Sequence, residues 1–301
     1  MVLSAWLLYR EVLVNKKFQE SFSAIVNGHV PVDWPWLMPV FILLFFNWAL
    51  ETVKWQVLIQ AFARPSFLLS YKAILTGVFV SFFTPNRVGE FAGRVIYLKE
   101  KKVEASLLTI AGSLAQNICT YLFGSLAALF FFAEQPFEWI IGGAVLFFLT
   151  VTLLFLYFNI DRLAALIRLL RLPKKWMKYF LPIRRLTWIQ LLKALGLSAL
   201  RYAVFTIQFV LMFKALAIPI SFGLALQGVG LLFLIQSVLP TIAFLEVTSR
   251  GIAAHYAFQM APDYDAAILF ASYSIWLINL FLPGMIGACL FLFNNKRDVD
   301  L

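Results

Sequence analysis

Four long stretches of this sequence contain no charged residue, and they constrain the fold more than any other feature. They are Ala105–Ala133, Trp139–Ile160, Ala215–Leu245 and Ala266–Asn295. A helix needs about 20 mostly apolar residues to cross the roughly 30 Å hydrocarbon core of a bilayer. The stretches are too long and continuous for the alternating strands of a membrane β-barrel. The sequence therefore predicts an all-α polytopic membrane protein.

The composition agrees with a chain that faces lipid. Hydrophobic residues make up 62% of the 301 residues and charged residues 13%, whereas a soluble domain carries about 25% charged residues. This excludes a soluble enzyme, a secreted disulfide scaffold and a disordered chain. Trp36–Ile59 and Leu186–Phe213 also qualify as spans, although each contains charged residues. Met1–Val14 is shorter, and we interpret it as an interfacial helix or as the remaining end of a span, so about six to seven spans are expected.

The charged residues are distributed unevenly between the predicted loops. Lys99/Lys101/Lys102, Asp161–Arg185 and Lys296/Arg297 are cationic, whereas Asp33, Glu134–Glu138 and Asp263–Asp265 are acidic. Cytoplasmic loops carry an excess of Lys and Arg. We therefore expect a multi-pass protein of a bacterial-type plasma (inner) membrane, with the cationic loops and the C-terminus in the cytoplasm.

Residues 161–185 mix cations with apolar residues, which predicts an amphipathic connector on the inner leaflet. The excess of Lys and Arg in the cytoplasmic loops thus explains the net charge of +10. We therefore expect no nucleic-acid partner.

This distribution requires two stretches that enter the membrane and return to the same side. The cationic clusters share one side only if Ser70–Leu98 and Phe222–Met260 each behave in this way. The apolar part of the first stretch, Ser70–Phe83, gives roughly 21 Å of helix, which is too short to span. It ends at Thr84-Pro85-Asn86, where the proline removes a helical hydrogen bond. The second stretch breaks at Pro240-Thr241. We therefore predict two re-entrant broken-helix hairpins.

The same charge pattern follows both breaks. Glu90 and Arg94 follow the first break, and Glu246 and Arg250 follow the second. Residues four apart lie on one face of a helix. Because three predicted spans separate the hairpins, the hairpins enter from opposite sides. We therefore predict one transmembrane domain, 1–301, with an inverted repeat whose halves cover about residues 36–133 and 186–295.

Eight charged residues fall within the predicted membrane segments. They are Glu51, Lys54, Arg87, Glu90, Arg94, Arg201, Glu246 and Arg250. Each costs about 2.5–3.5 kcal/mol on insertion scales. Local pairing (Glu51 with Lys54, Glu90 with Arg94, Glu246 with Arg250) is the structural explanation for six of them. Arg87 and Arg201 have no acidic partner nearby in the sequence, and the set carries two surplus positive charges.

Unpaired buried arginines point to an anionic ligand. A guanidinium fork matches phosphate geometry, and helix N-termini after the two prolines would add N–H donors. Inverted-repeat transporters place their substrate sites where broken helices meet near the midplane. We therefore expect the eight charged residues, with Thr84 and Asn86, to bind the head group of an anionic phospholipid or polyprenyl phosphate.

Three stretches of the chain resemble the flippase-like integral membrane family. They are Asn47-Trp48-Ala49-Leu50-Glu51 with Lys54-Trp55, Phe83-Thr84-Pro85-Asn86-Arg87-Val88-Gly89-Glu90, and Pro240-Thr241 through Glu246 and Arg250-Gly251. The family includes the transmembrane flippase region of bacterial lysylphosphatidylglycerol synthases (multiple peptide resistance factors). The resemblance implies re-entrant hairpins, lipid head-group binding and movement of lipid between leaflets. Many relatives carry a glycine-rich run where this chain has Ile242-Ala243-Phe244-Leu245.

The sequence leaves three functions open. The first is a lipid flippase, the second a membrane enzyme acting on a lipid-linked phosphate or sugar, and the third a non-transporting accessory subunit. Asp263-Tyr264-Asp265 resembles an acidic pair that holds a metal-bound nucleotide sugar, but we interpret it as a solvated turn. The sequence reveals no catalytic or metal-ligating constellation, no nucleotide-binding loop and no aminoacyltransferase domain after Leu301. We therefore expect no enzymatic activity and no cofactor. A second copy of the chain or a separate synthase are candidate protein partners.

Overall fold

The computed structural model describes residues 32–133, 137–159, 181–238 and 246–294, together with Ser23 and Asn27. Within these ranges the regular elements are all helices, which confirms the all-α prediction. Several predicted features lie outside the described residues. They are Met1–Val14, residues 161–180 of the connector, the break Pro240-Thr241 and the pair Lys296/Arg297.

Five helical units in the described ranges are long and apolar enough to cross a membrane. They are α3 (Trp34–Ile59), α6 (Lys102–Phe131), α7 (Phe137–Phe158), α11 (Trp188–Ala215) and one continuous unit made of α14 (Asp265–Trp276), the π-helix η4 (Leu277–Phe281) and α15 (Leu282–Asn294). A short helix, α10 (Leu181–Arg184), precedes α11. The total of six to seven spans stays a prediction, because the N-terminal segment lies outside the described residues.

The apolar stretch 215–245 does not form one through-going helix. Helix α11 ends at Ala215 and a shorter helix, α12 (Phe222–Val238), begins after a break. Ala217 in this break has a φ of 50°, a left-handed conformation that a helix cannot contain. Pro219, two residues later, lacks the N–H that a continuing helix would need. The break makes α12 a separate, shorter helix, while the re-entrant course of 222–260 stays a prediction.

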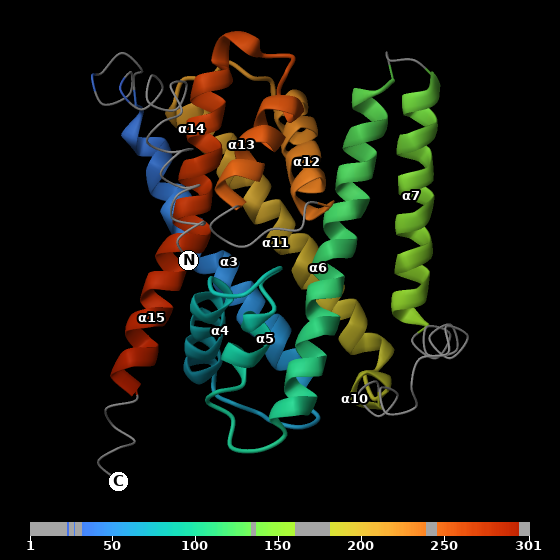
Figure 1. Cartoon of the computed structure of the whole chain (residues 1–301), viewed down its shortest axis with the longest axis vertical. Coiled ribbons are helices and arrows are strands. Elements are labelled where there is room, and N and C mark those ends of the chain that lie inside the picture. Colours follow the sequence, from blue (N-terminus) through green and yellow to red (C-terminus); the bar gives the residue numbers. More distant parts are fainter. Residues whose placement is uncertain are drawn as a thin grey trace.

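Helices α4 (Phe67–Ser81) and α5 (Gly89–Arg94) form the first helical pair. The hydroxyl of Ser66 caps α4 by accepting a hydrogen bond from the backbone N–H of Leu69 at 3.4 Å. The chain then reverses at the predicted break. A Cβ on Gly93 would lie 2.6 Å from the Cα of Gly77, so the two backbones touch. Both helices lie at the lower end of the molecule in Figure 1.

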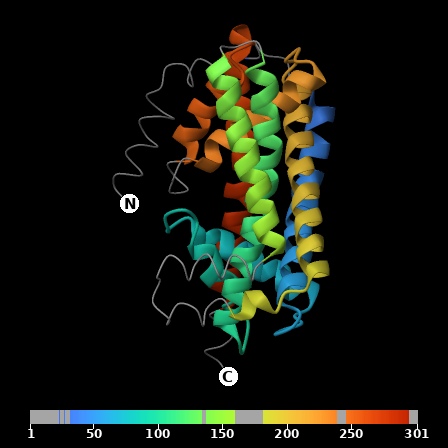
Figure 2. The same cartoon turned by 90° about the vertical axis from the view of Figure 1, so that its right-hand side faces the viewer.

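Helices α12 and α13 (Glu246–Ala257) form the second pair, at the upper end in Figure 1. Their contact also depends on a small residue, because a Cβ on Gly228 would lie 2.2 Å from the ring of Phe258. Figure 2 shows the two pairs from the side, one above the other. The pairs therefore belong to opposite ends of the bundle.

Each helical pair packs against the last long helix of the other half of the chain. Helix α12 packs on α6, and α4 packs on α15, while α3 and α11 cross at the centre. Both contacts are close: a Cβ on Gly124 of α6 would lie 2.7 Å from Leu234 Cβ, and one on Gly287 of α15 would lie 2.0 Å from the carbonyl oxygen of Leu75. Small residues allow membrane helices to approach in this way. This reciprocal packing is what an inverted repeat would produce, and the repeat, its boundaries and the single domain 1–301 all stay predictions.

The charged ends of the helices agree with the predicted orientation. The start of α6, which carries Lys102, lies at the lower end of Figure 1, as do α10 with Arg184 and the end of α15. The start of α3, after Asp33, and the start of α14, after Asp263, lie at the upper end. Among these helix ends, the cations Lys102 and Arg184 thus lie at one end of the bundle and Asp33 and Asp263 at the other, where Lys214 also lies beside Trp36. The cytoplasmic location of the end with Lys102 stays a prediction.

Candidate functional site

Glu51 of α3 is the centre of a buried charge network. Its side chain is 4% exposed. One carboxylate oxygen, Oε2, lies 2.7 Å from Lys54 Nζ, three residues along the same helix, and also contacts the guanidinium of Arg201 on α11. The other oxygen, Oε1, lies 2.8 Å from a guanidinium nitrogen of Arg94 on α5. One carboxylate therefore binds three cations from three helices.

A second carboxylate extends this network to the turn between α4 and α5. Glu90 contacts the guanidinium of Arg94 and lies 3.8 Å from that of Arg87. Glu51 and Glu90 together thus face four cations, which leaves a formal surplus of two positive charges within the connected group. Lys54 is further held by Ser198 of α11, whose hydroxyl lies 3.3 Å from Nζ.

Arg201 has partners that the sequence did not reveal. The prediction that it lacks an acidic partner is wrong, because Glu51 contacts it from a position 150 residues away. The same prediction is wrong for Arg87, whose partner Glu90 lies only three residues along the chain. Its Nε donates to Asn47 Oδ1 at 2.7 Å. Its Cζ lies 4.9 Å from the ring centroid of Trp48 and 5.5 Å from that of Phe205. These contacts hold the guanidinium in place, but its charge is only partly neutralised since Glu51 is shared.

The turn between α4 and α5 is held by its own residues. The hydroxyl of Thr84 accepts a hydrogen bond from the backbone N–H of Gly89 at 2.7 Å. Asn86 and Arg87 have φ values of 49° and 58°, which are unfavourable for side-chain-bearing residues by about 1 kcal/mol or more each. A Cβ on Gly89 would lie 2.7 Å from the Thr84 hydroxyl. The motif around Pro85 therefore builds a tight, strained turn that presents Arg87.

The start of α5 does not offer free N–H groups to an anion, contrary to the expectation from the sequence. The N–H of Gly89 is bound to Thr84, that of Glu90 to the Arg87 carbonyl at 3.0 Å, and that of Phe91 to the Val88 carbonyl at 3.1 Å. A six-residue helix that closes such a tight turn uses its first donors internally. This turn could therefore bind an anion only through its side chains.

The second helical pair carries its own ion pair. Arg250 of α13 lies 3.3 Å from the carboxylate of Glu246, one turn earlier on the same helix. The Arg250 side chain is 9% exposed. This pair was predicted from the spacing of four residues, and it is confirmed.

Two adjoining cavities lie between the two helical pairs. The larger has a volume of about 550 Å³ and is lined mainly by polar and aromatic residues of both halves. They are Asn86, Arg87, Gln116, Asn117, Thr120, Arg201, Tyr202, Phe205, Phe233, Gln236, Ser237, Val238 and Glu246. The smaller has a volume of about 100 Å³. Both cavities are lined by Arg87, Arg201 and Glu246, among other residues. The residues that line only the smaller cavity include Trp48, Arg250, Trp276 and Asn279. We call these the outer and the inner cavity.

The ten predicted site residues divide into two groups. Asn86, Arg87, Arg201, Glu246 and Arg250 line the cavities. The lining of the two cavities does not include Glu51, Lys54, Thr84, Glu90 or Arg94. The second group supports the first, because Glu51 holds Arg201 and Glu90 contacts Arg87.

The sequence reasoning did not identify the aromatic lining of the cavities. Trp48, Phe205, Phe233 and Trp276 all line the inner cavity. Trp48 lies one turn before Glu51 on α3, which was a usable signal. The others come from helices whose mutual placement only the folded chain reveals.

An apolar groove adjoins the outer cavity. It has a volume of about 740 Å³ and lies between α6, α11 and α12. Phe123, Phe130, Ala203, Ile207 and Leu226 are among its lining residues. Tyr202 lines both the groove and the outer cavity, so the apolar space lies directly beside the polar space.

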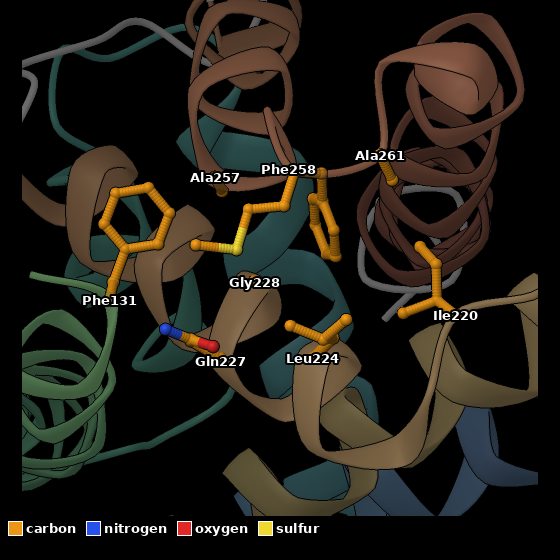
Figure 3. A pocket seen from close by; sticks show the side chains of 9 residues that line it. Phe131, Ile220, Leu224, Gln227, Gly228, Ala257, Phe258 and Ala261 are labelled. Carbon is orange, nitrogen blue, oxygen red and sulfur yellow. The ribbon is translucent and has the colours of Figure 1, made fainter. Parts of the chain in front are cut away.

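A further cavity near the ends of α6, α12 and α13 is too small to hold a ligand (Figure 3). Its volume is about 20 Å³, room for about one water molecule. Phe131, Leu224 and Phe258 lie around it. We assign it to imperfect packing.

Among the described residues, no group of three or more His, Cys, Asp or Glu side chains is arranged to hold a metal ion. Cys119 is buried and Cys289 exposed, and both are free.

These observations define a helical membrane protein with a cationic cavity between two helical pairs and an apolar groove beside it. The chain belongs to the lysylphosphatidylglycerol synthase TM region family, whose model matches residues 2–286. This confirms the resemblance seen in the sequence and makes the chain a membrane protein of a lipid-related family. No curated protein and no solved structure matches it.

Proposed function

We propose that this protein moves an anionic lipid across the membrane, binding the phosphate of the head group in the cavities between the two helical pairs. The lipid is a phospholipid or a polyprenyl phosphate. We further propose that the chain binds and translocates lipid without catalysing a reaction, and that its cationic end faces the cytoplasm of a bacterial-type plasma (inner) membrane.

The observation that carries this proposal is the imbalance of charge around the cavities. Three guanidinium groups (Arg87, Arg201, Arg250) and one carboxylate (Glu246) line them. Behind this lining, Glu51 is shared by three cations. Each of these arginines has a carboxylate partner, but the carboxylates are outnumbered, and an anion in the cavities would neutralise the surplus positive charge.

The neighbouring groove explains why the anion would be a lipid. A phospholipid needs a polar site for its head group and an apolar path for its chains. The outer cavity and the groove meet at Tyr202, so a head group can occupy the first while a chain lies in the second. A soluble anion would gain nothing from the groove.

Translocation further requires that the cavity be reachable from both leaflets. The two helical pairs belong to opposite ends of the bundle (Figure 1), and both contribute lining residues. Inverted-repeat transporters alternate access by moving one repeat against the other around a fixed site. We propose the same for this chain.

The test is lipid translocation by purified protein in liposomes. Fluorescent phosphatidylglycerol in the inner leaflet becomes accessible to a membrane-impermeant quencher only after it is moved. We expect the wild-type protein to accelerate this exposure and Arg87→Gln to slow it at least tenfold, because a charge-assisted hydrogen bond contributes about 1.5–3 kcal/mol. Arg87 is the suitable target, since its side chain is 34% exposed and its loss should leave the fold intact.

Lys193→Gln is the matched control, because Lys193 is exposed on α11 and lines neither cavity. This variant should translocate at the wild-type rate. Wild-type translocation by Arg87→Gln would contradict the proposal. A parallel assay with a fluorescent polyprenyl phosphate decides between the two lipid classes.

A further inference from the structure

Several residues that line the inner cavity carry a buried hydrogen-bond donor without a partner. Five of its lining residues have a buried N–H group without a partner within the described chain: Trp48 Nε1, Arg87 Nε, Gln236 Nε2, Arg250 Nε and Trp276 Nε1. They come from four helices and one turn. Such a concentration is unusual, because more than nine in ten buried polar groups in native structures are paired.

All five unpaired groups are donors. The unpaired acceptor near the site, Gln116 Oε1, belongs to a residue of the outer cavity. The carboxylate in the inner lining, Glu246, is already paired with Arg250. Each unsatisfied donor costs about 1–3 kcal/mol, and an acceptor-rich ligand that these residues could reach would recover that cost.

Water is a poor occupant for such a site. A water molecule that accepts from these N–H groups must also find acceptors for its own two hydrogens. A phosphodiester has oxygen acceptors on several sides and no hydrogen to place. The volume of about 100 Å³ is several times what one water requires.

The two tryptophans are firmly positioned. Trp48 is 2% exposed, and its ring lies against the guanidinium of Arg201. Trp276 is the residue at which the α-helix changes to the π-helix η4, and such π-helical turns are frequent at functional sites. In η4, Asn279 Oδ1 accepts from Asn47 Nδ2 at 3.2 Å, which ties this helix to α3 beside Trp48.

We propose that the inner cavity is the seat of the lipid phosphate, and that the indole N–H groups of Trp48 and Trp276 donate to its oxygens together with Arg87 and Arg250. This inference rests on the proposed function and deepens it, because it places the phosphate and adds two uncharged binding residues. The outer cavity then holds the rest of the head group, and the groove holds a chain. The arginines supply positive charge, and the indole N–H groups donate hydrogen bonds to the phosphate oxygens without adding charge.

The test uses the full-length protein in detergent micelles with its tryptophan indoles labelled by ¹⁵N. Dihexanoylphosphatidylglycerol, a soluble short-chain lipid, is the probe, and inorganic phosphate is titrated separately. The indole resonances of Trp48 and Trp276, identified by their loss in Trp48→Phe and Trp276→Phe, should shift downfield as the lipid binds. Phenylalanine keeps most of the ring and removes the N–H.

Trp55 provides the matched control. It lies on α3 like Trp48 and is 1% exposed, but its Nε1 already donates to Thr109 Oγ1 at 3.0 Å. Its resonance should stay in place, and Trp55→Phe should bind the probe within about twofold of wild type. Trp48→Phe and Trp276→Phe should each weaken binding about tenfold, the loss expected for one hydrogen bond to a charged group.

The outcomes separate this inference from the proposed function. Unshifted Trp48 and Trp276 resonances in wild-type protein that binds the lipid would overturn the phosphate seat. Translocation that depends on Arg87 would still stand in that case. Conversely, if the resonances shift but the protein translocates no lipid, phosphate binding in the inner cavity is supported and the proposed flippase function is contradicted. Binding of inorganic phosphate as tight as that of the lipid would overturn the assignment to a lipid head group.

Discussion

Glu51 of α3 and Arg201 of α11 join the first long helices of the two halves of the chain through a buried ion pair. Glu51 also binds Lys54 and Arg94, so removing its charge would leave three cations without their carboxylate. Breaking a buried ion pair from one side costs about 3–5 kcal/mol. We expect Glu51→Gln to lower the free energy of unfolding by about that amount, measured by denaturant unfolding in detergent.

Glu100→Gln is the control for this change, because Glu100 is exposed. It should unfold like the wild type. If Glu51→Gln were equally stable, the network would not hold the helices together, and the supporting role assigned to Glu51 would be wrong.

The turn that presents Arg87 should not tolerate a side chain at position 89. The Cβ of Gly89→Ala would lie 2.7 Å from both the Thr84 hydroxyl and the Val80 carbonyl. Overpacking of this kind costs typically about 1–3 kcal/mol, and we expect reduced thermal stability together with slower translocation. Gly142→Ala is the control, since nothing lies within 4 Å of its added Cβ. Alanine there should be neutral or stabilising by up to about 1 kcal/mol.

The close contact between α4 and α15 should depend on the absence of a side chain at position 287. The Cβ of Gly287→Ala would lie 2.0 Å from the Leu75 carbonyl, so α4 must move away from α15. Hydrogen exchange should then speed up in α4, while α12 and α6 exchange as in the wild type. Gly196→Ala, with open space around its Cβ, should change neither. Unchanged exchange of α4 in Gly287→Ala would show that this contact does not hold the first helical pair.

Sequence reasoning succeeded where the interactions are local. The break at Pro85 follows from one residue's chemistry, and the Glu246–Arg250 pair follows from helical spacing. It failed for Arg201, whose partner Glu51 lies 150 residues away and is reached only when α3 and α11 cross. It also expected free N–H groups at the start of α5, because it could not show that the turn consumes them.

The orientation of the bundle can be tested by cysteine labelling. In a protein whose Cys119 and Cys289 are replaced by alanine, we introduce Glu100→Cys at the cationic end or Asp263→Cys at the acidic end. Because cationic loops stay in the cytoplasm, a membrane-impermeant maleimide should label the Asp263 position in intact cells and the Glu100 position only after lysis. The reverse pattern would contradict the assigned orientation.

The most direct test of the central claim is an experimental density map of the protein in nanodiscs that contain phosphatidylglycerol. Our account predicts that both helical pairs turn back inside the bilayer, with head-group density between Arg87 and Arg250 and a chain running past Tyr202. Helical pairs that cross the whole bilayer, or a cavity that holds only water while lipid stays outside the bundle, would contradict it.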